Sequence, residues 1–143
     1  MQPKFSIVVI TKNEEKTLPR LLESLKEFRN RGGEICVCDT GSTDSTIELA
    51  KSAGCKVRAV GRRFLIPITN PNEINKRFIV SGEENIVKVG DIYFNFSAAR
   101  NYAASMAKND VVFFYDADES LYCRGLQENK MIDIKKICTC AIF

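Results

Sequence analysis

The sequence has 143 residues, of which 45% are hydrophobic and 27% are charged, the proportions of an ordinary globular domain with one buried core. Its formal net charge of +3 is too small to indicate a nucleic-acid or membrane-surface partner. The chain has no histidine, which excludes a Ser-His-Asp triad, a Cys-His dyad and a histidine-rich zinc site. Any bound metal must therefore be held by carboxylates or thiolates.

The apolar runs are short. The longest cover residues 7–10 and 111–115, so we expect no transmembrane segment. The first apolar run is followed directly by Glu14 and Glu15, which is not the pattern of a secretory signal. We therefore expect a cytoplasmic protein.

The six cysteines are interpreted as core residues and not as a disulfide framework, because disulfides are rare in the cytoplasm. Cys36 and Cys38 lie two apart in an apolar run, so on a strand they face the same side. Cys138 and Cys140 repeat this spacing. A zinc site built from the two pairs is the alternative, although zinc-binding pairs usually have longer spacers.

Strands and helices are predicted to alternate along the first part of the chain. Residues 5–10 form a continuous apolar run, typical of a strand buried on both faces. Residues 18–28 carry apolar side chains at helical spacing, and Gly32-Gly33 ends the predicted helix. Residues 34–39 are a second predicted strand.

The same alternation continues with a second helix and a third strand. Ser42-Thr43-Asp44 supplies N-cap chemistry for a helix that Gly54 ends, and residues 56–60 are the next strand. Successive strand–helix–strand units predict a parallel sheet with right-handed crossovers. The fold class is therefore α/β.

The pattern lapses between residues 61 and 95, where prolines and a polar turn indicate a hairpin insertion or a flap. Regular structure is expected to resume with Ser97 as an N-cap, an alanine-rich helix to Lys108 and a buried strand over 111–115. Residues 120–143 form a divergent tail, in which 131–137 fit a short helix or an edge strand.

Polar residues collect where three of the predicted strands end. In a parallel sheet these carboxyl ends face one crevice, which is the usual ligand site. We therefore expect one pocket rich in carboxylates, formed by Thr11, Asn13 and Glu14, by Asp39, Thr40 and Ser42, and by Asp116, Asp118 and Glu119.

The chemistry of this pocket favours a metal-bound phosphate. Neither a dinucleotide-binding glycine motif nor a P-loop is present. An acidic pocket accepts a phosphate only when a divalent cation lies between them, and Asp116 and Asp118 are expected to hold Mg²⁺ or Mn²⁺. Arg100 is expected to add a positive group near the phosphates. Asp39 is expected to accept a hydrogen bond from a pyrimidine N–H.

Four motifs together resemble family-two glycosyltransferases and occur in that family's order. They are residues 6–15 (SIVVITKNEE), 37–44 (VCDTGSTD), 96–101 (FSAARN) and 116–119 (DADE), the last containing an Asp-x-Asp (DXD) motif. The resemblance implies a GT-A (Rossmann-like) fold with a mostly parallel sheet. It also implies a nucleoside-diphosphate-sugar donor, usually a UDP-sugar, and metal-dependent, inverting transfer.

The resemblance also implies roles for single residues. Asp39 would contact uracil, Asp118 would bind the metal, and Asp116 would approach the ribose or the metal. The catalytic base is not identified, and Glu119 is a candidate. The implied nucleotide-sugar-binding residues are Thr11, Asn13, Glu14, Asp39, Arg100 and Asp116.

The sequence departs from the family pattern at three points. Thr40 stands where many members have a second acid, and 61–95 is longer than the usual link. Residues 120–143 do not resemble the half of the family that binds the acceptor. We therefore interpret 1–143 as a single nucleotide-sugar-binding domain truncated after the Asp-x-Asp motif. The acceptor can be a glycan, a protein or a lipid. A homo-oligomer is compatible with the sequence.

Several alternatives remain open at this point. Thr11, Asn13 and Asp39 are also suited to turns and caps. Arg100 is also suited to an ion pair with Glu119, and the Asp-x-Asp pair to a solvated strand end. For the whole chain, the alternatives to a glycosyltransferase are a binding or assembly module inactive on its own, and a metal-dependent nucleotidyltransferase.

Overall fold

The computed structural model describes residues 5–71 and 87–120. Its centre is a four-stranded sheet with strand order β3-β2-β1-β6, in which each neighbouring pair is parallel. This confirms the predicted α/β class and mostly parallel sheet. The strands are β1 (Phe5–Thr11), β2 (Glu34–Asp39), β3 (Lys56–Ala59) and β6 (Val111–Asp116).

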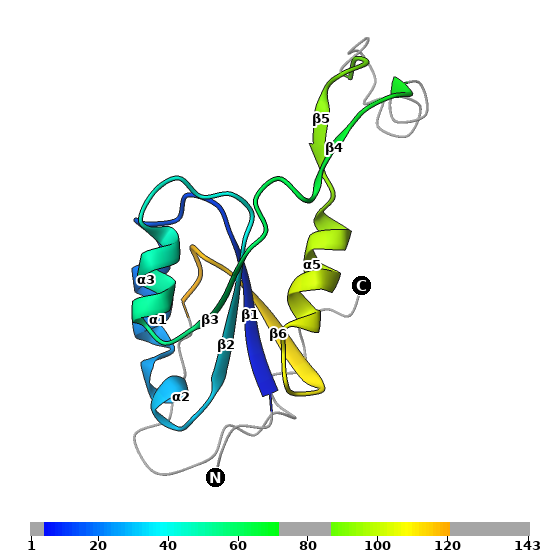
Figure 1. The fold of residues 1–143 in the computed structure, drawn as a ribbon. Coiled ribbons are helices and arrows are strands. Elements are labelled where there is room, and N and C mark those ends of the chain that lie inside the picture. Colours follow the sequence, from blue (N-terminus) through cyan, green and yellow to red (C-terminus); the bar gives the residue numbers. More distant parts are fainter. Residues whose placement is uncertain (1–4, 72–86, 121–143) are drawn as a thin grey trace.

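Helices cover both faces of this sheet, as Figure 1 shows. One face carries α1 (Leu18–Ser24), α2 (Lys26–Asn30) and α3 (Thr46–Ser52), and the other carries α5 (Phe96–Ser105). Within the described residues, no helix is long and apolar enough to cross a membrane.

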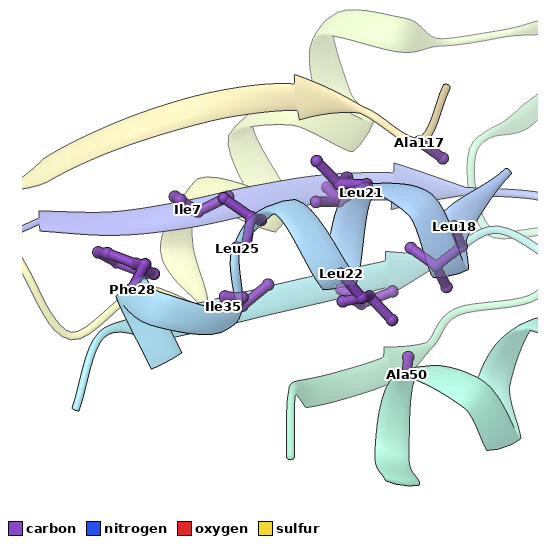
Figure 2. Packing of buried hydrophobic residues seen from close by; sticks show 11 residues of the cluster. Ile7, Leu18, Leu21, Leu22, Leu25, Phe28, Ile35, Ala50 and Ala117 are labelled. Atoms are coloured by element: carbon purple, nitrogen blue, oxygen red, sulfur yellow. The ribbon is translucent and has the colours of Figure 1, made fainter. Parts of the chain in front are cut away.

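The larger core cluster lies between the sheet and α1. Ile7 and Val9 of β1 alternate with residues of the opposite face, as expected for a strand buried on both sides. Burial of each such aliphatic side chain contributes about 1.5–3 kcal/mol. Leu18, Leu21 and Ala117 join this cluster, so the end of β6 is anchored against α1 (Figure 2).

The second core cluster lies between the sheet and α5. Cys36 and Cys38 are fully buried there with Ala99 and Ala103 of α5, which confirms their interpretation as small core residues. Burial raises the pKa of both thiols to about 11, so they stay protonated at neutral pH. Cys138 and Cys140 lie outside the described residues.

Two helix predictions are corrected by the structure. The helix predicted over 18–28 divides at Leu25, whose backbone angles of φ −96° and ψ 6° are not helical, while Leu25 and Phe28 are both buried. The N-cap of α5 is Asn95 and not Ser97, because the Asn95 side chain accepts from the N–H of Ala98 at 3.0 Å. This helix ends at Ser105, before Lys108.

β6 is less buried than predicted, because it is the edge strand of the described sheet and has a neighbour on one side only. Val111 is 47% exposed and Phe114 is 37% exposed. The segment 61–95 contains β4 (Leu65–Pro67) and β5 (Ile92–Phe94), which pair antiparallel and project from the body (Figure 1). The prediction for 131–137 falls outside the described residues.

Candidate functional site

Three strand ends meet at the carboxyl edge of the sheet. Thr11 is the register partner of Asp39, and Ile10 is the register partner of Asp116. Neighbouring strands lie about 4.8 Å apart, so the backbones of Asp39 and Asp116 are separated by about 10 Å, with β1 between them. The parallel sheet therefore brings the predicted segments to one edge.

Asp39 is fully buried, and its carboxylate is surrounded by donors. Oδ2 accepts from the Thr11 hydroxyl at 3.1 Å and from the Ser42 hydroxyl. Oδ1 accepts from the N–H of Gly41 at 3.0 Å and from the N–H of Ser42 at 2.9 Å. These four bonds match the acceptor capacity of a carboxylate, which is the geometry of the loop-cap alternative. The contact to a base stays a prediction.

Gly41 allows the loop after β2 to wrap around Asp39. Its φ of +109° lies in a region that residues with a side chain rarely adopt. The turn brings two successive backbone N–H groups onto one carboxylate oxygen, as in an Asx turn. The backbone conformation of this turn therefore explains why position 41 is glycine.

The loop after β1 is fastened to the loop after β2 through Asn13. The N–H of Asn13 donates to the Ser42 hydroxyl at 2.8 Å, and the Asn13 side-chain oxygen accepts from the N–H of Thr43 at 2.8 Å. Asn13 has a φ of 56°, and asparagine adopts this left-handed region more readily than most residues. We call these two loops, residues 12–17 and 40–46, the clasp.

Further along the clasp, the contacts are again reciprocal. The N–H of Glu14 donates to the buried Thr46 hydroxyl at 2.8 Å. The N–H of Glu15 donates to Asp44 at 3.2 Å, and the Glu15 carboxylate accepts from the N–H of Ser45 at 3.2 Å. Ser45 is the N-cap residue of α3, one position after the predicted Ser42-Thr43-Asp44 signal.

Asp44 takes part in helix initiation through its carboxylate, which accepts from the N–H of Thr46 at 3.0 Å and from the Thr46 hydroxyl. Desolvation acts to raise its pKa, but the hydrogen bonds from Thr46 and from the N–H of Glu15 outweigh it and lower the pKa below its ordinary value. Asp44 is therefore a permanent anion at neutral pH and part of the clasp.

The Asp-x-Asp motif forms a turn directly after β6. Ala117 is only 4% exposed and packs into the α1 cluster, whereas Asp116 and Asp118 on either side of it are exposed. Within the described residues, neither of these two carboxylates has a hydrogen bond or an ion pair to another side chain. Figure 2 shows Ala117 directed toward the helix side of the sheet.

This acid pair fits a divalent cation that is bound together with a phosphate. Mg²⁺ is commonly held by one or two carboxylates, with substrate oxygens and water filling the remaining positions. No group of three acids or cysteines close enough to ligate a metal occurs in residues 5–71 and 87–120. The arrangement suits a shared protein–phosphate site and not an all-protein cage.

Glu119, the candidate base, accepts the N–H of Asp116 through Oε2 at 3.0 Å. Its own N–H donates to the carbonyl oxygen of Asp116 at 3.0 Å. Glu119 thus closes the turn that contains the acid pair. A carboxylate engaged in this way has a structural explanation, and a role as base stays a prediction.

Arg100 does not pair with Glu119, so that alternative is wrong. Its guanidinium lies over the rings of Phe96 and Phe114, 4.9 and 5.3 Å from their centroids. Phe114 and Asp116 are two apart on β6, so they face the same side of the sheet. Arg100 is therefore held by stacking on the face of the sheet that Asp116 also faces.

Arg20 belongs to this edge and was not predicted from the sequence. Its Nη2 donates to the main-chain oxygen of Asp118. One signal for it exists in the sequence: a basic residue in the first turn of a helix opposes the helix dipole, which favours acids there. A basic residue in this position at the carboxyl edge of a parallel sheet therefore indicates a contact with another segment of the fold.

The sheet order, the covering helices and the acid pair define a GT-A-type α/β domain. Solved structures of S. aureus TarS residues 1–349 share this fold. One of them aligns with a TM-score of 0.51 at 23% identity over 82% of this chain and 28% of its own. Another, in complex with UDP-GlcNAc, aligns with a TM-score of 0.51 at 23% identity over 81% of this chain and 27% of its own.

The sequence model of glycosyl transferase family 2 matches residues 6–65, and glycosyltransferases are similar to most of the chain. An uncharacterized glycosyltransferase of Rickettsia typhi is 31% identical over 118 residues, 82% of this chain and 29% of that protein. A 4,4'-diaponeurosporenoate glycosyltransferase of Staphylococcus haemolyticus is 31% identical over 116 residues, 81% of this chain and 24% of that protein. The chain thus spans less than a third of the length of these relatives.

Proposed function

We propose that the chain binds a nucleoside-diphosphate sugar, with a UDP-sugar as donor, and forms the donor-binding part of a metal-dependent, inverting glycosyltransferase. The observation that carries the proposal is the exposed carboxylate pair of Asp116 and Asp118 at the sheet edge, which has no side-chain partner among residues 5–71 and 87–120. The match to glycosyl transferase family 2 supports the same activity, and the S. aureus TarS structures in complex with UDP and UDP-GlcNAc support the same donor class.

In this proposal Asp118 and Asp116 hold Mn²⁺ or Mg²⁺ together with the donor diphosphate. The cation supplies Lewis-acid stabilisation of the charge that develops on the departing UDP. Arg100, kept in place by its two aromatic neighbours, adds positive charge on the same side. The two acids lie on either side of buried Ala117, which anchors the turn that carries them.

The nucleoside part is proposed to lie against the clasp, near Thr11, Asn13 and Glu14. A pyrimidine N–H can reach Asp39 only by replacing one of its four present donors. The Ser42 hydroxyl is the donor that rotates most freely, because the other three are two backbone N–H groups and a buried threonine. Base recognition would then be an exchange of one hydrogen bond for another.

A second candidate function is a donor-binding or assembly module that transfers no sugar on its own. The engagement of Glu119 in the turn after β6 favours it, because this acid is then not free to take a proton from an acceptor hydroxyl. The acceptor, whether glycan, protein or lipid, would in that case be positioned by a partner.

Titration calorimetry with UDP tests the proposed function directly. The expected result is binding in the presence of Mn²⁺ and much weaker binding in EDTA, since the acid pair repels an uncompensated diphosphate. Uridine, which has no phosphates, serves as the control and should bind equally under both conditions. Equal UDP affinity with and without metal would exclude the proposed role of the acid pair.

A further inference from the structure

Within the described residues, one hydrogen bond connects α1 to Asp118, the second acid of the Asp-x-Asp turn, and Arg20 donates it. Its Nη2 donates to the main-chain oxygen of Asp118, 98 positions further along the chain. The contact leads from the helix after β1 to the turn after β6, and so bridges two of the segments that form the sheet edge.

The helix fixes the origin of the Arg20 side chain. Leu18 and Leu21 on either side of it are fully buried in the core, and the N–H of Leu18 donates to the carbonyl oxygen of Glu14 at 2.9 Å. Arg20 itself is exposed. A rigidly placed backbone with a solvent-facing side chain gives the guanidinium a defined reach toward the turn.

The turn has other anchors, which act on Ala117, on Asp116 and on the N–H of Glu119. Ala117 is held by the core, and Asp116 and Glu119 hold each other through two hydrogen bonds of 3.0 Å. Within the described residues, the hydrogen bond from Arg20 is the only one made by Asp118. The Asp118 carbonyl shares its peptide unit with the N–H of Glu119, which donates to Asp116, so Arg20 holds the carbonyl end of a unit whose N–H end is held by the turn.

We infer that Arg20 is a positioning residue that orients Asp118 toward the cation–diphosphate pair. The inference rests on the proposed donor site. The hydrogen bond adds a second restraint to the peptide unit that follows Asp118 and connects it to α1, which limits the positions from which the Asp118 carboxylate can approach the cation. A guanidinium has five N–H donors, and this contact uses one of them, so Arg20 also keeps positive charge beside the two acids.

The chain offers a matched control for this role. Arg29 on α2 also donates to main-chain oxygens, from Nη1 to Ala53 at 2.5 Å and from Nη2 to Leu22 at 3.1 Å. The contact with Ala53 lies at the C-terminal end of α3 and not at the carboxyl edge of the sheet. Replacing Arg29 removes the same kind of contact without touching the acid pair.

The test compares Arg20→Met, Arg20→Lys and Arg29→Met with the unchanged chain. Calorimetry measures affinity for UDP with Mn²⁺ and for uridine, and the electron paramagnetic resonance spectrum of Mn²⁺ reports the metal environment. Arg20→Met is expected to weaken Mn²⁺-dependent UDP binding about tenfold and to leave uridine binding unchanged. Arg20→Lys should restore part of the affinity, because lysine keeps the charge and can donate to the carbonyl.

Arg29→Met is expected to lower the melting temperature while the affinity for UDP with Mn²⁺ stays unchanged. The inference is overturned if Arg20→Met binds UDP and Mn²⁺ as the unchanged chain does, or if it loses uridine binding to the same extent, which indicates a general structural role. If the unchanged chain itself shows no metal-dependent UDP binding, the proposed function fails and the inference with it. The two failures are therefore distinguishable.

Discussion

The Thr11 hydroxyl donates to Asp39 Oδ2 at 3.1 Å, and the two residues are also register partners at the ends of β1 and β2. The backbone of Thr11 extends the same connection, since its carbonyl oxygen accepts from the N–H of Thr40 at 2.9 Å and from the Thr40 hydroxyl at 3.0 Å. The hydrogen bonding between β1 and β2 therefore continues directly into the clasp. Thr40, where many family members have a second acid, has a structural role here.

Asp39→Asn is expected to reduce both stability and UDP affinity. An amide nitrogen cannot accept from the donors that now surround Oδ1 or Oδ2, so at least one buried donor loses its partner at a cost of about 1–3 kcal/mol. Urea denaturation measures the first effect and calorimetry the second. Thr11→Val, which removes one donor and leaves the carboxylate, is the milder comparison. An unchanged UDP dissociation constant would restrict Asp39 to its role as a loop cap.

Asp118→Asn is expected to weaken Mn²⁺-dependent UDP binding by about tenfold or more, because an amide is a poorer ligand for a hard cation than a carboxylate. Uridine binding should change little. Asp110→Asn is the matched control: Asp110 is an exposed acid that immediately precedes β6, at the opposite end of the strand. Similar losses in both variants would point to a general effect of charge and not to a metal ligand.

Lowering the pH is expected to destabilise the fold in part through Glu34. This residue begins β2, at the end of the strand opposite Asp39. Its carboxylate accepts from the Ser6 hydroxyl at 2.6 Å and from the N–H of Lys108 at 2.8 Å. Burial acts to raise its pKa, but these bonds, with the charges of Lys56 and Lys108, outweigh burial and lower the pKa below its ordinary value.

A lowered folded-state pKa means that the unfolded chain binds a proton at higher pH than the folded protein does. The contribution of Glu34 is therefore complete above the unfolded pKa and is lost as the pH falls through the folded pKa. Glu34→Gln should flatten this part of the acid limb in urea denaturation measured over a pH series. Glu27→Gln, at an exposed surface ion pair with Arg31, should leave the limb nearly unchanged.

Much of the fold could be predicted because the signals are local. The apolar run of β1 and the helical spacing of Leu18, Leu21 and Leu22 each reflect burial against one sheet, and the alternation of elements determines the parallel order. The position of the site at the carboxyl edge follows from that order alone. The split at Leu25 was not visible, because both halves keep the same apolar spacing.

The detailed state of the site could not be predicted because it depends on distant partners. Asp39 and Arg100 were recognised as residue types, but their present neighbours are loop donors and aromatic rings. Arg20 and Thr46 were missed because each contributes through a hydrogen bond to a backbone group of another segment. The apolar periodicity of the sequence carries no information about such a contact. A side chain's chemistry can be inferred from sequence, whereas its partner comes from the fold.

A polypeptide of these 143 residues is expected to bind the donor and to transfer sugar poorly or not at all. Inverting transfer needs a base within hydrogen-bond reach of the acceptor hydroxyl, on the side opposite the departing UDP. Asp116 and Asp118 are assigned to the donor, and Glu119 is engaged with the N–H of Asp116. Loss of general-base assistance costs about 10²–10⁴ in rate, before any loss of acceptor positioning.

The measurement is UDP release from a panel of UDP-sugars with Mn²⁺, with and without candidate glycan, protein and lipid acceptors. Slow hydrolysis that does not respond to acceptor would agree with the expectation, and a longer family member assayed in parallel would show that the conditions support transfer. Rapid, acceptor-dependent release would contradict it. In that case Glu119→Gln is the first variant to make, because a base at this position must leave the N–H of Asp116 to reach the acceptor, and its removal should then abolish turnover while UDP binding persists.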